Sequence, residues 1–472
     1  MRSNYFLPSL KIFLAIAVFL MLASCTAQYA MNPKLDAKTR EHPMESKLVS
    51  QARSNDLFLI LSFSGGGIRA AALSYGVLEA LDQVEIPALQ NISPSQTASV
   101  RHTLLDEVDL ITGVSGGSFT AAYYGLYGRD ALKDFREKVL LQDLQVGLIR
   151  TVINPVNWGR LWSPRFGRSD IAQEYYDSMI FHGTTLGDLA NGKGPAVNIL
   201  ATDADDGIIF PFLPSQFSLI CSDFEKFPLA RAVAASAAFP GALSPIILKN
   251  YAGACSYKQP LWMTSALAKP DPTSRVYYKA LMTKTYLDPE TKPYIHLIDG
   301  GVSDNLGIRS IMESIAAMGG IREIMKKENM TGGRQLVFII VDAQTQERKK
   351  WSLLGEIPGI GAILDASSTI MINKYNFETI DLLRRYSTEW TNELKQDGNK
   401  DVEIYIIHIC FDLLPDKNER GYFQEIPTAL TLPEEKVDKL RKVAGKLLYA
   451  QEPFIRLVKS LGGSIPAAGQ KN

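Results

Sequence analysis

The apolar residues of this chain gather in short, uninterrupted runs. Six runs have the length and composition of buried strands, at 57–63, 108–112, 197–201, 294–298, 336–341 and 404–411. Helix-compatible segments lie between them. Continuous apolar strands that alternate with helices are typical of a largely parallel sheet with both faces covered. We therefore predict an α/β fold in which helices cover both faces of a mostly parallel central sheet.

The N-terminal segment has a different pattern. A positively charged start precedes an apolar run at 12–23, which suits a signal-peptide core and is short for a membrane span. Small residues and then Cys25 follow, so we expect a lipobox, with residues 1–24 removed and Cys25 lipidated. An ordinary secretory signal is the alternative. Residues 25–56 would then be a flexible tether on a membrane-anchored lipoprotein of the bacterial cell envelope, in the outer membrane if the host has one.

Charge and composition exclude several classes of function. The 472 residues carry 50 cations and 50 acids, and loss of the signal peptide removes two cations and no acid, which brings the net charge to −2. A nearly neutral chain lacks the basic footprint of a nucleic-acid-binding protein. The five histidines and four cysteines form no cluster with metal-ligand spacing. We expect no nucleic-acid partner, no metal and no cofactor.

The strand at 108–112 runs into a turn built from glycine and serine. The residues are Gly113-Val114-Ser115-Gly116-Gly117, and helix-compatible small and apolar residues follow. This G-x-S-x-G pattern between a strand and a helix predicts a nucleophile elbow, with the Ser115 hydroxyl above the sheet. Gly113 and Gly117 would permit the tight turn. The alternative is a loop that merely ends a strand.

A second glycine loop follows the first strand. Gly65, Gly66 and Gly67 precede a helix that we expect to reach about Leu81. Backbone N–H groups at such a helix start could bind a dinucleotide phosphate or stabilise an oxyanion. Because the dinucleotide interpretation leaves Ser115 unexplained, we favour an oxyanion hole formed by the three glycines. Glycines that only permit close helix–strand packing are the structural alternative.

The strand at 294–298 ends in Asp299-Gly300-Gly301, a place where α/β sheets build sites. An Asx turn that closes the strand is the alternative function of Asp299. His296 precedes it by three positions, and side chains alternate along a strand, so His296 should face the other way. Asp299 itself would then be the base, with a pKa raised by partial burial.

Three motifs in this order resemble the set of the patatin-like phospholipase family: Gly65-Gly66-Gly67-x-Arg69, Gly113-x-Ser115-x-Gly117 and Asp299-Gly300-Gly301. The resemblance implies a Ser115–Asp299 dyad on that family's own α/β fold, in a catalytic domain at 57–313. A C-terminal extension at 314–472 would pack on the same domain. The segments at 235–240 and 202–203 also look family-like.

The glycine loop departs from the common family pattern. Ser64 stands before the glycines and Ala70 after Arg69, which is similar to the loop of cytosolic phospholipase A2. In that protein the arginine is associated with the substrate phosphate. The resemblance makes Arg69 a candidate phosphate ligand, and a helix-docking role is the alternative.

The resemblance implies a lipid acyl hydrolase of the phospholipase A or lysophospholipase type that works through an acyl-enzyme. Acyl transfer or thioester hydrolysis with the same dyad is one alternative, and a lipoprotein scaffold without activity is another. The substrate would be a lipid or phospholipid, and the membrane would be reached through Cys25. The head group, the sn-position and the oligomeric state are left open.

Other segments allow two interpretations each. Cys221 and Cys255 could pair in an oxidising compartment, and Cys410 is expected to be an inert core thiol. The segment at 246–293 is either an aromatic lid or a surface insertion. The apolar segment at 351–361 is expected to cover the core rather than to contact lipid, because exposed apolar patches are the exception.

Overall fold

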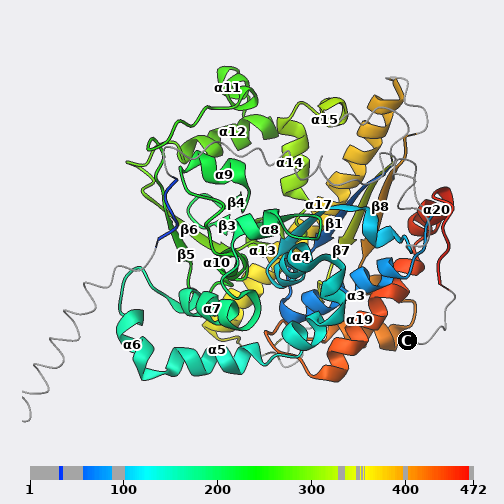
Figure 1. Ribbon diagram of the computed structural model, residues 1–472, viewed down its shortest axis with the longest axis horizontal. Coiled ribbons are helices and arrows are strands. Elements are labelled where there is room, and N and C mark those ends of the chain that lie inside the picture. Colours follow the sequence, from blue (N-terminus) through cyan, green and yellow to red (C-terminus); the bar gives the residue numbers. More distant parts are fainter. Residues whose placement is uncertain are drawn as a thin grey trace, which may run out of the picture.

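A computed structural model describes residues 31–35, 57–87, 101–327, 335–346, 351, 355, 357–396 and 402–466. An eight-stranded sheet lies at its centre, with helices on both faces (Figure 1). Seven strands follow the order β5-β6-β3-β2-β1-β7-β8, and β4 pairs with β3 beside this path. The predicted α/β fold with a mostly parallel, covered sheet is confirmed.

The strands are β1 Leu57–Phe63, β2 Val108–Val114, β3 Ala196–Asp203, β4 Ile208–Pro211, β5 Ile246–Lys249, β6 Tyr294–Asp299, β7 Gln335–Val341 and β8 Ile404–Ile409. The α-helices are α3 Gly67–Asp82, α4 Gly116–Tyr127, α5 Leu144–Ile153, α6 Pro155–Leu161, α7 Arg168–Tyr176, α8 Leu186–Ala190, α9 Pro214–Leu219, α10 Leu229–Ser236, α11 Leu261–Ala268, α12 Arg275–Thr285, α13 Gly301–Asp304, α14 Arg309–Ala317, α15 Ile321–Lys327, α17 Ile360–Gln396, α18 Lys417–Gln424, α19 Glu434–Tyr449 and α20 Glu452–Ser460.

Strand β1 explains why the apolar runs are continuous. Its residues Leu59 and Leu61 face one hydrophobic core, which includes α3, α4 and α19. Ile60, between them, faces a second core under α14 and α17. Because successive side chains point to opposite faces, a strand buried on both sides needs apolar residues at every position.

Strands β1, β2, β3, β7 and β8 are parallel, whereas β4, β5 and β6 are antiparallel to their neighbours. The direction of β6 decides where Asp299 lies. On its β3 side, β6 pairs with the last three residues of β3, Ala201 to Asp203, in a register that places Asp299 opposite Ala201. Val114, the last residue of β2, lies opposite Leu200. The end of β6 therefore reaches the level at which β2 ends, although the two strands run in opposite directions.

The C-terminal extension contributes to the same sheet. β7 pairs with β1, and β8 pairs with β7. Helix α19 packs along α3, where the guanidinium of Arg441 forms an ion pair with Glu79. Residues after 313 thus complete both the sheet and the layer that covers the glycine loop.

Part of the expected tether is bound to the body, which corrects the sequence prediction for residues 31–35. Asn32 is buried, and its amide donates to Ser222 Oγ at 2.9 Å. The N–H of Lys249 donates to Asn32 Oδ1 at 2.7 Å. A disulfide between Cys221 and Cys255 lies beside this contact. Cys25 and the signal segment at 1–24 lie outside the described residues.

The expectation that 351–361 covers the core is wrong for the residues that can be described. Ile357 is 96% exposed and Ile360 is 80% exposed, at the start of α17. Residues 352–354 and 356 lie outside the described part of the chain. The segment at 246–293 supplies the edge strand β5 and the helix pair α11 and α12. No helix in the described ranges is long and apolar enough to span a membrane.

Candidate active site

Ser115 occupies a sharp turn between β2 and α4, as the G-x-S-x-G pattern predicts. Its backbone has φ 49° and ψ −119°, a conformation that costs energy for a residue with a side chain. The turn brings α4 close to β1, because a Cβ at Gly117 would lie 2.5 Å from the carbonyl oxygen of Phe63. A Cβ at Gly113 would lie 2.8 Å from the Cβ of Ala121. Both positions therefore require glycine.

Asp299 contacts Ser115 directly. The hydroxyl of Ser115 donates to Asp299 Oδ2 at 2.7 Å, and the N–H of Gly301 donates to Asp299 Oδ1 at 2.8 Å. The Thr202 hydroxyl donates to the Asp299 carbonyl oxygen at 2.8 Å. Gly300 faces the backbone of Leu200 with no room for a Cβ. The two sequence-predicted residues thus form a buried pair, held by the loop that follows β6.

The environment of Asp299 makes it a stronger base than an exposed aspartate. Burial raises the pKa of its carboxyl to about 6, although hydrogen bonds from Gly301 and Ser115 act in the opposite direction. A carboxylate with a pKa near neutrality takes a proton more readily than one with the ordinary value of 3.8. The pair therefore has the geometry and the basicity that proton transfer from a serine hydroxyl requires.

His296 lies on the other face of β6, as alternation predicts. The residues Ile295, Leu297 and Asp299 are buried, whereas His296 is 41% exposed at its side chain. Its Nδ1 lies 3.5 Å from Asp205 Oδ2. The prediction that His296 does not join the site is confirmed.

The three glycines of the first loop are not equivalent. The N–H of Gly65 donates to the carbonyl oxygen of Asn305 at 3.2 Å, so this donor is already engaged. Gly66 and Gly67 have φ of 137° and 61° and stand at the start of α3. The first N–H groups of a helix lack partners within the helix, so this is where donors can face a ligand. A Cβ at Gly65 would come within 3.3 Å of the Ser115 Cβ, which places the loop beside the nucleophile.

The guanidinium of Arg69 is buried and points into the protein. Its Nε donates to the Ala343 carbonyl at 2.8 Å, and NH1 donates to the Ile426 carbonyl at 2.6 Å. NH2 donates to Thr428 Oγ1 at 2.9 Å. Each nitrogen thus contacts a segment that follows β7 or precedes α19. These contacts favour the alternative in which Arg69 docks its helix on the rest of the protein. The geometry does not support a role of Arg69 in binding the substrate phosphate.

Two functional contacts were not assigned from the sequence. The N–H of Ser115 donates to Ser236 Oγ at 2.8 Å, at the end of α10. Asn305 accepts the N–H of Gly65, as described above, and its side-chain oxygen lies near the position of a Gly65 Cβ. The small-residue pattern around Ser236 marks a family-like helix end, but nothing local indicates its partner.

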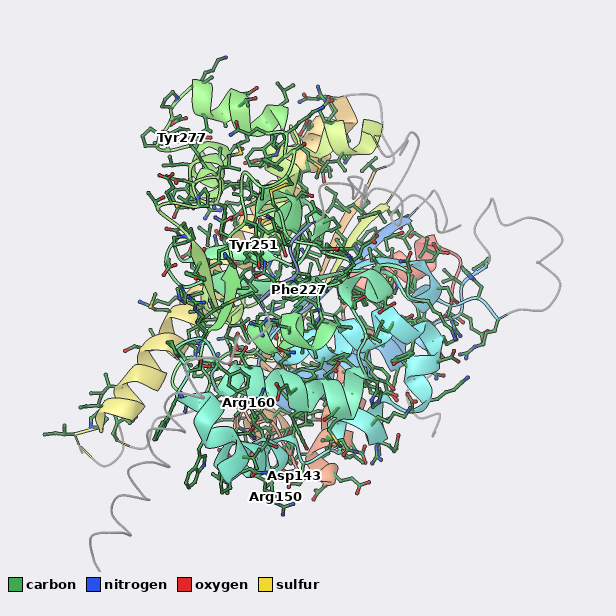
Figure 2. The ribbon with its side chains drawn as sticks, turned by 60° about the vertical axis from the view of Figure 1, so that its left-hand side comes forward. Asp143, Arg150, Arg160, Phe227, Tyr251 and Tyr277 are labelled. Carbon is green, nitrogen blue, oxygen red and sulfur yellow. A yellow bond between two sulfur atoms is a disulfide. The ribbon has the colours of Figure 1, made fainter. Side chains whose placement is uncertain are left out.

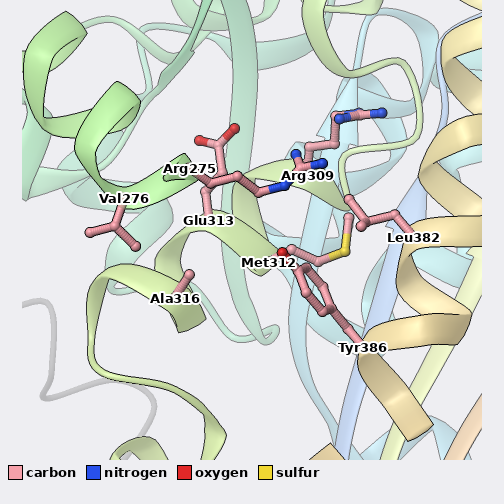
Figure 3. A pocket seen from close by; sticks show the side chains of 8 residues that line it. All are labelled: Arg275, Val276, Arg309, Met312, Glu313, Ala316, Leu382 and Tyr386. Atoms are coloured by element: carbon pink, nitrogen blue, oxygen red, sulfur yellow. The ribbon is translucent and has the colours of Figure 1, made fainter. Parts of the chain in front are cut away.

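A pocket lies apart from the dyad, between α12, α14 and α17 (Figure 3). Arg275, Arg309, Glu313 and Tyr386 are among its lining residues, and neither Ser115 nor Asp299 is. Arg309 is committed to the protein, since its Nε donates to Thr379 Oγ1 at 2.7 Å. The described residues hold no group of three or more side chains that could bind a metal ion.

Comparisons with known proteins bear on the family and the fold. The sequence matches the family model described as patatin-like phospholipase over residues 61–312, a little more than half of the chain. Curated protein sequences give no match. Among solved structures, human GIVD cytosolic phospholipase A2 is similar, with 12% identity and a TM-score of 0.43, over 89% of this chain and 64% of that one.

Two further structures match with lower TM-scores. The human protein in complex with methyl gamma-linolenyl fluorophosphonate has 13% identity and a TM-score of 0.40, over 89% of this chain and 61% of that one. VipD from Legionella pneumophila has 12% identity and a TM-score of 0.27, over 90% of this chain and 72% of that one. The chain spans a little under two thirds of the length of the human protein.

Proposed function

Because the chain belongs to the patatin-like phospholipase family, we propose that it is a lipid acyl hydrolase of the phospholipase A or lysophospholipase type, with Ser115 as nucleophile and Asp299 as base. The observation that carries the proposal is the 2.7 Å hydrogen bond from the Ser115 hydroxyl to Asp299 Oδ2 in a buried site. Ser115 has a strained backbone, and its hydroxyl contacts a buried carboxylate. This arrangement does not stabilise the fold in an evident way, but it is the arrangement that nucleophilic catalysis by a serine requires.

The reaction has two halves. Asp299 takes the hydroxyl proton as Ser115 Oγ bonds to the ester carbonyl carbon, and the carbonyl electron pair moves onto oxygen. When this pair returns, the bond to the alcohol breaks, and the alcohol leaves with the proton from Asp299. Water then attacks the acyl-enzyme with Asp299 again as base, which releases the fatty acid and restores Ser115. The chemistry requires no metal or cofactor.

The oxyanion would lie against the glycine loop. We assign the donor role to the N–H groups of Gly66 and Gly67, since that of Gly65 is bonded to Asn305. Loss of one such donor typically costs about 10²–10³ in rate. The helix start at Gly67 adds the positive end of the α3 dipole at the same place.

Acyl transfer to another alcohol, or thioester hydrolysis, would use the same acyl-enzyme and differs only in the acceptor or the leaving group. The inactive scaffold has less support, because the Ser115 hydroxyl donates to Asp299 and the chain carries the three loop glycines. We also propose that the protein is lipidated at Cys25 and held on a membrane of the bacterial cell envelope. The disulfide between Cys221 and Cys255 is consistent with an oxidising compartment.

The proposal is tested with a fluorophosphonate probe, which reacts with activated serines, followed by incubation with defined lipids. We expect the probe on Ser115, identified by peptide mass spectrometry, and free fatty acid among the products. Ser74→Ala is the matched control, since Ser74 is a buried serine on α3 that makes no hydrogen bond to the elbow, and it should keep labelling. Labelling that persists in Ser115→Ala would refute the nucleophile. Labelling without release of fatty acid from any lipid would favour the transferase alternative.

A further inference from the structure

Consecutive helices α5 and α6 carry several exposed apolar side chains, outside the catalytic machinery. Six large apolar side chains on these helices and the following residue are exposed by 38% to 80%, and we call them the α5–α6 surface: Val146, Ile149, Ile153, Val156, Trp158 and Trp162. Isolated exposed apolar residues are ordinary, but six of them on two consecutive helices, with two tryptophans among them, are typical of an interaction site.

The local structure holds this surface in a fixed shape. Leu144 and Leu148 bury the inner face of α5. Asn154 caps α6, where its side chain accepts the N–H of Val156, and Asn157 Nδ2 donates to the Thr151 carbonyl at 2.8 Å. The outward position of the apolar residues is therefore built into two capped helices and their connection.

The segment that carries these side chains is positively charged. Between Asp143 and Asp170 the chain has four arginines and no acid, although the whole protein has equal numbers of both charges. Arg150, Arg165 and Arg168 are exposed, and Arg150 lies at the lower edge of the molecule (Figure 2). Arg160 forms an ion pair with Glu174. A helix that presents tryptophan and aliphatic residues together with arginine is suited to the interface of an anionic bilayer.

The first end of the segment is bound beside the glycine loop. The Thr431 hydroxyl donates to Asp143 Oδ1 at 3.0 Å and accepts the N–H of Gln145 at 3.1 Å. Two residues before Thr431, the Ala429 carbonyl accepts the N–H of Ile68 at 2.9 Å. The start of α5 is thus fixed to the loop that lies against the start of α3.

The other end is bound beside the loop that holds Asp299. Arg168 NH2 donates to the Gly241 carbonyl at 3.2 Å, and Ser169 bonds to Ser244. Three residues before Gly241, the Ala238 carbonyl accepts the N–H of Asp299 at 3.0 Å. The segment therefore connects the two loops that frame the dyad.

We propose that the α5–α6 surface docks the protein on an anionic phospholipid bilayer, with Trp158, Trp162 and the aliphatic side chains in the interface. Arg150 and Arg165 would contact lipid phosphates. Docking through this segment would bring the two loops that frame the dyad toward the bilayer. It is independent of the dyad chemistry and of any lipid on Cys25, which would hold the chain near a membrane without orienting it. Helix α11, which begins at the exposed Leu261, lies at the opposite end of the molecule from α5 and α6 (Figure 1).

The test uses the full chain with Ser115→Ala, so that the lipids stay intact, and vesicles whose acyl chains carry bromine, which quenches tryptophan on contact. One set contains phosphatidylcholine alone, and the other contains equal parts of phosphatidylcholine and phosphatidylglycerol. We expect quenching in the anionic vesicles and severalfold less in the neutral ones. Replacing Trp158 and Trp162 by Phe should remove most of it. Trp262→Phe, on α11, is the matched control and should retain it.

Charge variants test the electrostatic part. Arg150→Gln and Arg165→Gln should each weaken partitioning into anionic vesicles by about fivefold at low salt, whereas Lys269→Gln, at the end of α11, should not. Quenching that survives loss of both tryptophans would overturn the proposal, and so would equal quenching in both vesicle sets. Iodide quenching can also be measured at rising protein concentration without vesicles. If Trp158 and Trp162 became shielded from iodide, the surface would bind a second copy of the chain, and the bilayer proposal would be overturned.

Discussion

Ser236 holds the backbone of Ser115 through a single hydroxyl. Its Oγ accepts the N–H of Ser115 at 2.8 Å and donates to the Leu200 carbonyl at 2.6 Å. One side chain thus joins the elbow, β3 and the end of α10. Because Ser115 has a positive φ, the strain of its turn must be balanced by contacts of this kind.

Ser236→Ala should therefore loosen the elbow without touching the substrate. It leaves a buried N–H without a partner, which costs about 1–3 kcal/mol of stability. We expect kcat to fall by more than KM changes, because the nucleophile is displaced while the lipid-binding surface stays intact. Steady-state kinetics and urea denaturation measure both effects.

The matched control is Ser74→Ala. Ser74 is also fully buried on a helix beside the core, but its hydroxyl has no hydrogen-bond partner among the residues that the structure describes. Its loss should leave kcat unchanged and cost little stability. If both variants behaved alike, the hydrogen bond to Ser115 would have no special role.

The pKa of Asp299 predicts an acid limb in the pH profile. The carboxyl must be ionised to act as a base, and burial raises its pKa to about 6. Activity should thus rise as pH increases through about 6. The pH dependence of kcat/KM gives the pKa of this group in the free enzyme. Asp304, whose pKa is also raised to about 6 by burial, lies nearby. Asp304→Asn should leave the limb in place, and a limb that vanished in this variant would reassign the base.

The same pKa has the opposite consequence for stability. Between pH 3.8 and about 6, the carboxyl of Asp299 is protonated in the folded state and ionised in the unfolded chain. The free energy of unfolding therefore decreases as pH rises from 3.8 to about 6. Above pH 6 the penalty is about 3 kcal/mol, at 1.36 kcal/mol for each unit. Asp299→Asn should abolish hydrolysis but stabilise the protein at pH 8 more than at pH 4. Denaturation at the two pH values that gave equal differences would contradict this reasoning.

The features that the sequence predicts correctly depend on residues that are close together in the chain. The pattern at 57–63 predicts β1 with its observed bounds, and the motifs place Ser115 and Asp299 in one site. These features are local: an apolar run, a tight turn, a strand end. The four-residue strands β4 and β5 were not predicted, because such short strands leave little pattern.

Other features depend on residues far apart in the chain. β6 runs antiparallel to β3, a direction that its own apolar pattern does not indicate. The Gly65 donor is engaged by Asn305, and Arg69 is bonded to Ile426, some 240 and 357 positions away. No local pattern encodes such partners, so the oxyanion glycines looked equivalent and Arg69 looked available for phosphate.

The contacts of Arg69 predict that its replacement is a folding defect rather than a change of substrate preference. Arg69→Lys keeps the charge but cannot form the three hydrogen bonds to Ala343, Ile426 and Thr428. Hydrogen bonds of charged groups are worth about 1.5–3 kcal/mol each, so stability should fall clearly. Activity on neutral esters and on phospholipids should fall by the same factor. A loss confined to phospholipids would restore the phosphate role.

The disulfide between Cys221 and Cys255 should matter for stability and not for chemistry. It closes a loop with a sequence separation of 34 residues, for which the chain-entropy model gives about 3–4 kcal/mol. The double variant Cys221→Ser/Cys255→Ser should lose about this much in urea denaturation. Its kcat should persist on a soluble ester, because the dyad is held by the ends of β2 and β6 instead.

Cys410→Ser is the control for the loss of a thiol. Cys410 is the free cysteine among the described residues, and burial raises the pKa of its thiol to about 12, which makes it a poor nucleophile. Its replacement should change stability little. A reducing agent should lower the stability of the wild type to that of the double variant and leave the double variant unchanged. If the reducing agent had no effect on the stability of the wild type, the disulfide would be absent in solution. The contact of Asn32 with Ser222 would then form without a disulfide beside it.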